Sequence, residues 1–356
     1  MLLFFILYVA IVCYGLTFRR HRTTEYLDVE HTQSVKGIFI LLVFFSHFNL
    51  TVTYTSPMDA LYARIVTFFG QTMVTMFLFY SGYGVMESIK AKGMRYIAAI
   101  PQKRIVGTVL RFETAVLVYI IVSALLGEIY TPTHYLLAIL GWESVGNSHW
   151  YIFDIVLLYL LTYISFRMTY RQDRERPMLA ASIVLIVTCI GILILIRYPG
   201  IKPIWWYDTI LCYAMGLVYS LYKDRIESII NRNLGTWIVF LVVFWVLFYF
   251  FKMRSNNIWM VMGTNIAFCI AVIILTMRLL FRNKVLMWCG QHLFEIFILH
   301  RIPICVLQYF ALDELNVYLY FVGCVILTAV LIMPFRKLTD RVVDFMQLFW
   351  QKRICS

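Results

Sequence analysis

Residues 35–53 of the chain read VKGIFILLVFFSHFNLTVT. This stretch is long enough to cross a bilayer as a helix, because about 20 residues at a rise of 1.5 Å span roughly 30 Å of hydrocarbon. It also carries two polar side chains that such a helix normally avoids, Lys36 near its start and His47 near its end. The stretch therefore predicts a membrane fold and marks the first place to search for a functional site.

Ten further apolar runs lie on either side of this stretch, approximately at 1–17, 64–86, 105–127, 149–168, 178–197, 204–222, 234–251, 257–280, 285–308 and 315–334. Of the 356 residues, 62% are hydrophobic and only 14% are charged, and the mean hydropathy is +0.80. Soluble domains carry about 25% charged residues. The composition excludes a soluble enzyme, a disordered chain and a fibrous repeat. We predict an all-α fold, a polytopic transmembrane helical bundle of about 10–11 spanning helices.

The domain organisation is predicted to be simple, with residues 1–356 forming one integral-membrane domain. No loop exceeds roughly 20 residues, which leaves no room for a second domain. The first run, 1–17, is expected to be an extra N-terminal spanning helix and not a signal peptide. No basic residue precedes it, and its charges, Arg19, Arg20 and Arg22, follow it.

The basic residues predict the orientation in the membrane. Most of the 31 lysines and arginines fall in alternate loops, whereas the loop 128–148 contains none. By the positive-inside rule the protein is a multi-pass plasma-membrane protein with its N-terminus outside and its C-terminus cytoplasmic. The net charge of +12 thus comes from basic loops that set the orientation in the membrane. We expect the lipid bilayer as a partner and no nucleic acid. The eight cysteines are scattered without a CxxC pair, and we expect no disulfide framework and no metal.

Lys36 and His47 share one face of the predicted helix. They are eleven residues apart, which is about three turns, and they lie roughly 16 Å apart along the axis. A neutral imidazole can take a proton from a hydroxyl near pH 7, so His47 is a candidate general base. Lys36 would attract an anionic group or help to hold the active geometry. The alternatives are a histidine that only packs against another helix and a lysine that reaches the interface.

The segment PQKRIVGTVLRFE places Arg104 and Arg111 seven residues apart, nearly in line on one helix face. Such a basic stripe can bind the phosphates of a nucleotide-linked donor through bidentate hydrogen bonds. The alternative is that Arg104 only sets the topology and that Arg111 pairs with an acid such as Glu113 or Glu87.

Two other segments carry polar residues inside apolar runs. In GQHLFEIFILHRIPI, His292 and Glu295 are three residues apart and can meet on one helix face, and His300 lies nearer the outer side. Glu295 and His300 are candidate substrate-binding residues, although a structural pair is the favoured alternative for Glu295. His149 and Trp150 begin the run 149–168 and are expected to line an external mouth.

Four segments in order resemble the acyltransferase 3 family of membrane O-acyltransferases. These are KGIFILLVFFSH, GQTMVTMFLFYSGYGV with its Ser81-Gly82-Tyr83, SHWYIFDIVLLYLL, and GQHLFEIFILH. The resemblance covers about residues 31–334. This chain departs from the family pattern at Leu293, where serine is usual, and before the fourth run, where Gly107 and Leu110 replace an arginine and a proline.

The resemblance implies transfer of an acyl group, most often acetyl, from cytoplasmic acyl-CoA to a hydroxyl of a cell-envelope saccharide. It implies that His47 is the essential histidine, whether it only removes a proton or carries the acyl group. Acetyl-CoA is then a co-substrate, and a saccharide or lipid-linked glycan is the acceptor. Two alternatives stay open at this stage: an exporter of a polysaccharide or lipid-linked sugar, and an acyltransferase with a small-molecule acceptor.

Overall fold

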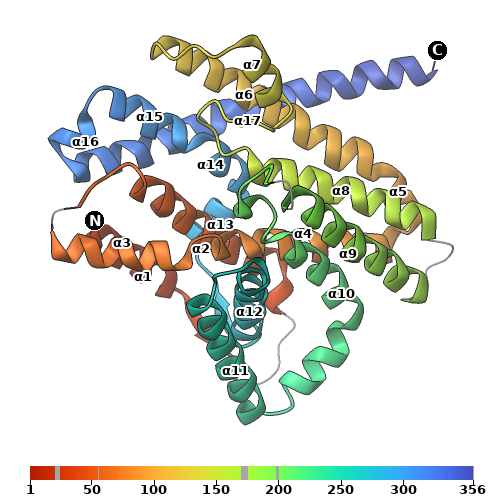
Figure 1. The fold of residues 1–356 in the computed structure, drawn as a ribbon. Coiled ribbons are helices and arrows are strands. Elements are labelled where there is room, and N and C mark those ends of the chain that lie inside the picture. Colours follow the sequence, from red (N-terminus) through yellow and green to blue (C-terminus); the bar gives the residue numbers. More distant parts are fainter. Residues whose placement is uncertain (21–24, 55, 170–174, 198–199, 356) are drawn as a thin grey trace.

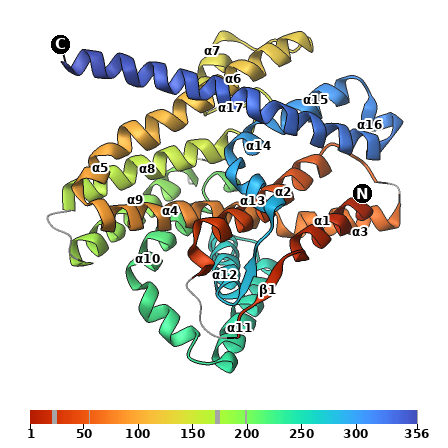
Figure 2. The ribbon, with the colours of Figure 1, turned by 180° about the vertical axis from the view of Figure 1, so that it is seen from behind.

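The computed structural model describes residues 1–356 except 21–24, 55, 170–174, 198–199 and 356. Helices make up nearly all of the described chain, so the all-α prediction is confirmed. The two termini lie on opposite sides of the bundle (Figures 1 and 2). Arg22, which belongs to the predicted basic group after the first run, lies outside the described residues.

The helices and strands follow one another as stated here. Up to residue 169 they are α1 (Leu2–Cys13), β1 (Leu16–Phe18), the 3-10 turn η1 (Glu25–Leu27), α2 (Val29–Asn49), α3 (Pro57–Phe69), α4 (Thr72–Lys92), α5 (Met94–Ile100), the π-helix η2 (Pro101–Val106), α6 (Gly107–Leu125), α7 (Pro132–Ile139) and α8 (Trp150–Thr169). The rest are α9 (Glu175–Arg197), the 3-10 turn η3 (Ile204–Trp206), α10 (Ile210–Ile230), α11 (Leu234–Met253), α12 (Ile258–Thr276), β2 (Leu279–Phe281), α13 (Lys284–Gln291), α14 (Leu293–Leu299), α15 (Arg301–Tyr309), α16 (Leu312–Leu315) and α17 (Val317–Cys355).

Each of the eleven apolar runs coincides with at least one helix. Within the described ranges, six helices are long and apolar enough to cross a membrane, or seven if the bent pair from Lys284 to Tyr309 is one span. This number is lower than the 10–11 spans expected from the sequence. The 12 residues of α1 make a helix of only about 18 Å. Other runs lie on helices such as α2 and α10 that also contain charged residues.

The first run does not stay helical through residue 17, as the sequence had suggested. The helix α1 ends at Cys13, and Gly15 follows with φ +79°, a conformation that glycine adopts without strain. A Cβ at Gly15 would lie 2.3 Å from the carbonyl oxygen of Arg282. Strand β1 then pairs antiparallel with β2, with Leu16 opposite Phe281. This small sheet ties the N-terminal segment to the loop before α13.

Two glycines bring the backbones of α2 and α13 into direct contact. A Cβ at Gly37 would lie 1.9 Å from the carbonyl oxygen of Leu286, and a Cβ at Gly290 would lie 1.9 Å from that of Gln33. Small residues permit this approach in membranes, where van der Waals packing replaces the hydrophobic effect between helices. The contact fixes α2, with Lys36 and His47, against the segment that begins at α13.

A second glycine pair joins α4 to α10. A Cβ at Gly82 would lie 2.0 Å from the carbonyl oxygen of Tyr213, and a Cβ at Gly216 would lie 2.2 Å from that of Phe79. The glycine of the Ser-Gly-Tyr motif therefore has a packing role in this structure.

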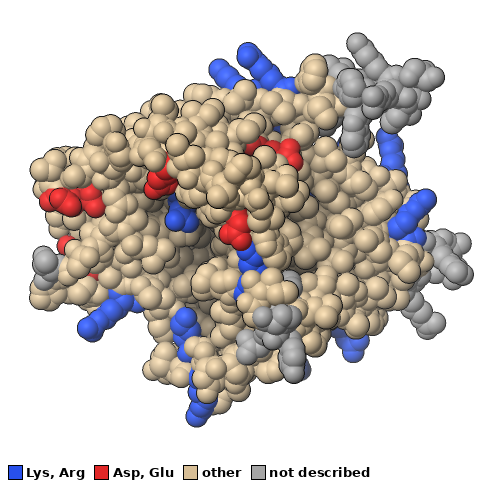
Figure 3. All heavy atoms as spheres, turned by 45° about the horizontal axis from the view of Figure 1, so that its top comes forward, with Lys and Arg blue, Asp and Glu red and all other residues tan. Residues whose placement is uncertain are grey.

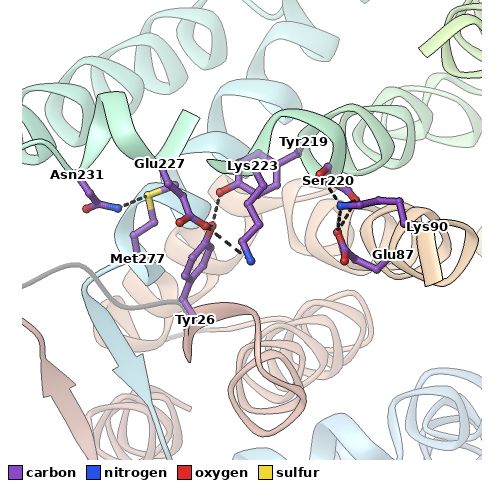
Figure 4. Close-up of polar contacts among 9 residues, drawn as sticks. All are labelled: Tyr26, Glu87, Lys90, Tyr219, Ser220, Lys223, Glu227, Asn231 and Met277. Carbon is purple, nitrogen blue, oxygen red and sulfur yellow. Dashed lines mark hydrogen bonds and ion pairs between the residues drawn. The ribbon is translucent and has the colours of Figure 1, made fainter. Parts of the chain in front are cut away.

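Near the start of α2, polar contacts join the 3-10 turn η1 and the helix α4 to α10 (Figure 4). The hydroxyl of Tyr26 donates to the buried carboxylate of Glu227 over 2.6 Å. Two turns earlier on α10, the hydroxyl of Ser220 donates to Glu87 over 2.6 Å, and Lys90 pairs with the same carboxylate oxygen over 2.7 Å. These contacts hold η1 and α4 against α10, so these acidic groups serve the fold.

The surface agrees with a membrane environment. In Figure 3 most of the visible face carries no charged side chain, and the charged side chains lie mainly at its edges and around a central hollow. Many large apolar side chains are exposed on the helices that could span a membrane, among them Leu117, Val242 and Ile326. In a bilayer these side chains face lipid, which is as apolar as they are.

We expect Gly290→Ala to destabilise the protein. The added methyl group would clash with the main-chain oxygen of Gln33. A main-chain atom cannot move aside by changing a side-chain rotamer, so α13 must move away from α2. Such overpacking costs about 1–3 kcal/mol. Thermal unfolding of the purified protein in detergent measures the change. The matched control is Gly84→Ala, since a Cβ at Gly84 has no neighbour within 4 Å. Equal unfolding temperatures for the two variants would contradict the packing role of Gly290.

Candidate active site

The central feature of the site is a direct contact between two histidines from distant parts of the chain. His47 lies two residues before the last residue of α2, and His300 lies at the junction of α14 and α15. The Nδ1 atom of His47 is 2.5 Å from the Nε2 atom of His300, and the two ring planes differ by only 5°. The rings are therefore nearly coplanar, as an in-plane N–H···N hydrogen bond requires.

A main-chain carbonyl decides which nitrogen carries each proton. The Nδ1 atom of His300 is 2.8 Å from the carbonyl oxygen of Ile296, and a carbonyl oxygen can only accept. In a neutral pair the proton of His300 is thus on Nδ1, and its Nε2 accepts a hydrogen bond from Nδ1–H of His47. This leaves the lone pair on Nε2 of His47, the nitrogen that can act as a base.

The position of His300 depends on a break in the predicted run 285–308. The axis turns by 70° between Lys284–Gln291 and Leu293–Tyr309, at His292. The hydroxyl of Tyr119, on α6, donates to the carbonyl oxygen of Ile298 over 2.7 Å and holds α14 in its new direction. The bend directs the end of α14 toward the end of α2, which brings His300 to His47.

His47 lines a cavity of about 270 Å³, here called the His47 cavity. Its walls come from the last turns of α2 and α3, from the start of α4, and from Trp150 and Phe297. Its polar lining includes Asn49 and Gln71. The Oδ1 atom of Asn49 is buried and has no hydrogen-bond partner among the described residues. The cavity thus offers a base, an aromatic ring and amide groups to a bound molecule.

A second cavity, of about 140 Å³, lies between α4, α6, α8 and α14 and is here called the Ser81 cavity. Ser81 of the Ser-Gly-Tyr motif, Thr108 and Tyr159 supply its polar groups. Leu293, which stands where the family usually has serine, also lines it. The Ser81 cavity therefore gathers residues of three of the motif segments.

Lys36 and Arg104 lie near each other at the opposite end of α2 from His47. The two cations interact electrostatically, and Lys36 Nζ lies 6.0 Å from the ring centre of Tyr80. Arg104 Nε donates to the hydroxyl of Tyr96 over 3.2 Å, and its guanidinium lies 5.9 Å from the ring centre of Tyr159. In the described part of the chain no carboxylate forms an ion pair with either cation. Two neighbouring cations without a counter-charge form a suitable site for an anion.

The π-helix η2, Pro101–Val106, carries Arg104. Its wider turn leads directly into α6, and Pro101 has no N–H to contribute to the helical hydrogen bonds. Single π-turns of this kind are frequent at functional sites.

The structure places Arg111 away from this anion site. Its Nη2 atom forms an ion pair of 2.8 Å with Asp340 on α17. The charge of Arg111 therefore helps to hold α6 against α17. Arg104 and Arg111 do not form the shared basic site that the sequence predicted. The acid is neither Glu113 nor Glu87, because the partner comes from a helix more than 200 residues later in the chain.

Glu295 forms a structural pair with His292, as the alternative interpretation had it. Its Oε2 atom is 3.9 Å from Nδ1 of His292, which also lies 3.5 Å from Arg336 on α17. Glu295 lines neither of the two cavities described above.

The other predicted substrate-binding residues lie closer to His47. Trp150 lines the His47 cavity, and His300 contacts His47 itself. His149 does not line this cavity; its ring lies 5.2 Å from that of Trp206. The adjacent residue Trp150 is thus the one that joins the site.

Sequence analysis missed several residues that the structure brings to the site. Asn49, Thr67 and Gln71 line the His47 cavity, but each stands near the end of a helix, where polar residues are common and carry no special signal. Arg301 follows His300 and acts electrostatically on both histidines. No carboxylate forms an ion pair with it within the described ranges, so an isolated positive charge lies beside the pair.

Comparison with known families now adds to the geometry. The family model for the acyltransferase domain matches residues 24–336, nearly the whole chain. No curated protein and no solved structure matches the chain. The matched residues include α2 with His47, the Ser81 motif and α14 with His300. The resemblance predicted from the four segments is confirmed, and the chain is a membrane protein of the acyltransferase 3 family.

Proposed function

We propose that this membrane acyltransferase moves an acyl group, most simply acetyl, from acyl-CoA to a hydroxyl of a cell-envelope saccharide, with His47 as the general base. The observation that carries the proposal is the hydrogen bond from His47 to His300. It leaves the basic nitrogen of His47 free, on a side chain that lines a cavity. Such a lone pair inside a membrane protein is suited to taking a proton from a hydroxyl.

The reaction balances with these groups alone. Nε2 of His47 takes the proton of the acceptor hydroxyl as its oxygen attacks the thioester carbonyl carbon. A C–O bond forms, the negative charge moves to the carbonyl oxygen, and the C–S bond breaks when the carbonyl re-forms. The leaving thiolate takes the proton from the His47 imidazolium, which restores the base. His300 positions His47 through the hydrogen bond and takes no part in bond making.

The donor is proposed to enter at the end where Lys36 and Arg104 lie. Coenzyme A carries several phosphate charges, and two cations without a carboxylate partner favour such a ligand. The distribution of basic residues along the sequence supports a cytoplasmic location for this end, in a plasma-membrane protein with its N-terminus outside. Cytoplasmic acyl-CoA would then reach the site without crossing the bilayer.

The acceptor is proposed to bind in the His47 cavity. Trp150 offers an aromatic face to the C–H side of a sugar ring, while Asn49 and Gln71 offer amide groups to its hydroxyls. The unpartnered Oδ1 atom of Asn49 is an acceptor that a sugar hydroxyl would satisfy. These groups suit a neutral polar acceptor.

His47→Ala is expected to lower acyl transfer by about 10²–10⁴-fold, the usual contribution of a general base. Mass spectrometry of envelope glycans from cells that express each variant measures the acyl content. Binding of acetyl-CoA and the unfolding temperature of the purified variant serve as controls and should stay close to wild type. Wild-type acylation by His47→Ala would remove the proposed base.

Two variants of His300 separate positioning from packing. His300→Leu removes the acceptor for Nδ1–H of His47 and is expected to lower kcat by about 10²-fold, the effect of a misplaced catalytic group. His300→Gln retains an acceptor oxygen and should keep more of the activity. CoA release by purified protein in nanodiscs, followed with a thiol reagent, gives kcat and KM. Equal kcat values for the two variants would show that catalysis does not depend on the hydrogen bond from His47 to residue 300.

Arg104→Met is expected to raise KM for acetyl-CoA about 10-fold and to leave kcat nearly unchanged, since one charge-assisted hydrogen bond contributes roughly 1.5–3 kcal/mol. The control is Lys103→Met, which removes an exposed positive charge from the adjacent position. If both variants bind acetyl-CoA as wild type does, the donor enters elsewhere.

A further inference from the structure

One side chain lines both the Ser81 cavity and the His47 cavity. Phe297, on α14, belongs to the lining of each, and its side chain is buried. Its ring centre lies 5.1 Å from that of Tyr151 and 6.4 Å from that of His300. The phenyl ring is therefore a wall that the two cavities share, and the ring of His300 lies beside it.

The Ser81 cavity connects this ring to the anion site. Tyr159 lines that cavity, and the guanidinium of Arg104 lies over the ring of Tyr159. From Arg104 toward His47 the order is thus Tyr159, the Ser81 cavity, Phe297 and the His47 cavity. This order rests on shared lining residues and ring contacts.

We propose that Phe297 is the specificity-determining residue for the acyl group, closing the passage from the donor side and limiting the acyl chain that fits beside His47. This inference rests on the proposed function. A thioester bound through its phosphates at Arg104 must present its carbonyl carbon at Nε2 of His47. Lys36 and His47 are eleven residues apart on α2, roughly 16 Å along its axis. The Ser81 cavity, which borders both Tyr159 and Phe297, offers the flexible arm of the donor a route across this distance that passes Phe297.

The size of the His47 cavity limits the length of the acyl chain attached to the reacting carbonyl. About 270 Å³ must hold the acyl chain and the reacting part of the acceptor together. The phenyl ring occupies the side of that space from which the acyl group arrives. A smaller side chain at position 297 would release volume there for further methylene groups, and a larger one would obstruct entry.

The ring also separates the two cavities when no donor is bound. A purely structural phenylalanine would affect stability without changing which acyl group is transferred, so chain selectivity distinguishes the two roles.

The test compares Phe297→Leu and Phe297→Trp with wild type, using acetyl-, propionyl- and butyryl-CoA and purified protein in nanodiscs. Transfer to envelope glycan is followed by mass spectrometry, and CoA release by a thiol reagent. Phe297→Leu should raise the propionyl-to-acetyl transfer ratio about 10-fold, the discrimination that one methylene carries in an apolar pocket. Phe297→Trp should lower the transfer of all three acyl groups while the Kd for CoA stays unchanged.

The matched control is Phe268→Leu. Phe268 on α12 is as buried as Phe297, with 2% of its side chain exposed in each case, and it lines neither cavity. Its variant should unfold at a lower temperature without a change in acyl selectivity. If Phe297→Leu is too unstable to purify, Phe297→Met replaces the ring by an unbranched side chain that adapts to its surroundings, and it should shift the ratio in the same direction.

The outcomes separate this inference from the proposed function. Unchanged chain selectivity in Phe297→Leu, or wild-type transfer by Phe297→Trp, overturns the role of Phe297 even if His47→Ala is inactive. Wild-type transfer by His47→Ala overturns the proposed function instead. A selectivity shift of the same size in Phe268→Leu would also overturn the inference, because it would then follow from lost stability alone.

Discussion

The contact between the backbones of α2 and α13 is the constraint on which the rest of the site depends. Gly37 and Gly290 place each helix against main-chain atoms of the other, where no side chain can adjust. The lateral position of α2 is thereby fixed by main-chain contact. Since α2 carries a cation at one end and an imidazole at the other, this single packing event places both halves of the proposed reaction. The 70° turn after α13 then directs His300 back to the same helix.

The polar residues illustrate how a membrane protein accommodates groups that its solvent disfavours. Glu227 meets Tyr26, Arg111 meets Asp340 and Glu295 lies near His292, so each of these charges has a partner. Lys36, Arg104 and Arg301 differ, since within the described ranges no acid forms an ion pair with them. Cations that stay without an acid partner inside a membrane protein are candidates for binding an anionic ligand. The ion pairs above, in contrast, are accounted for by the packing of the bundle.

The sequence predicted more of the helices than of their arrangement. Every apolar run contains at least one helix, because long apolar stretches in lipid have few other ways to satisfy their backbone. The short helices α3, α5 and α7 were missed, since none stands alone as a spanning run. His47 and Trp150 were identified from residue type and spacing, and they do share a cavity. The partnerships His47–His300 and Arg111–Asp340 join residues 253 and 229 positions apart, and no periodicity within one helix contains that information.

The carbonyl oxygen of Ile296 belongs to the peptide backbone and not to a side chain. It selects the tautomer of His300, which in turn orients His47, yet no substitution can delete it. The tautomer of the His47–His300 pair therefore depends on the helical geometry of α14. A substitution anywhere on that turn that lets the helix unwind would disturb the proposed base while leaving both imidazoles in the chain. Inactivating changes in this protein need therefore not touch a single reactive side chain.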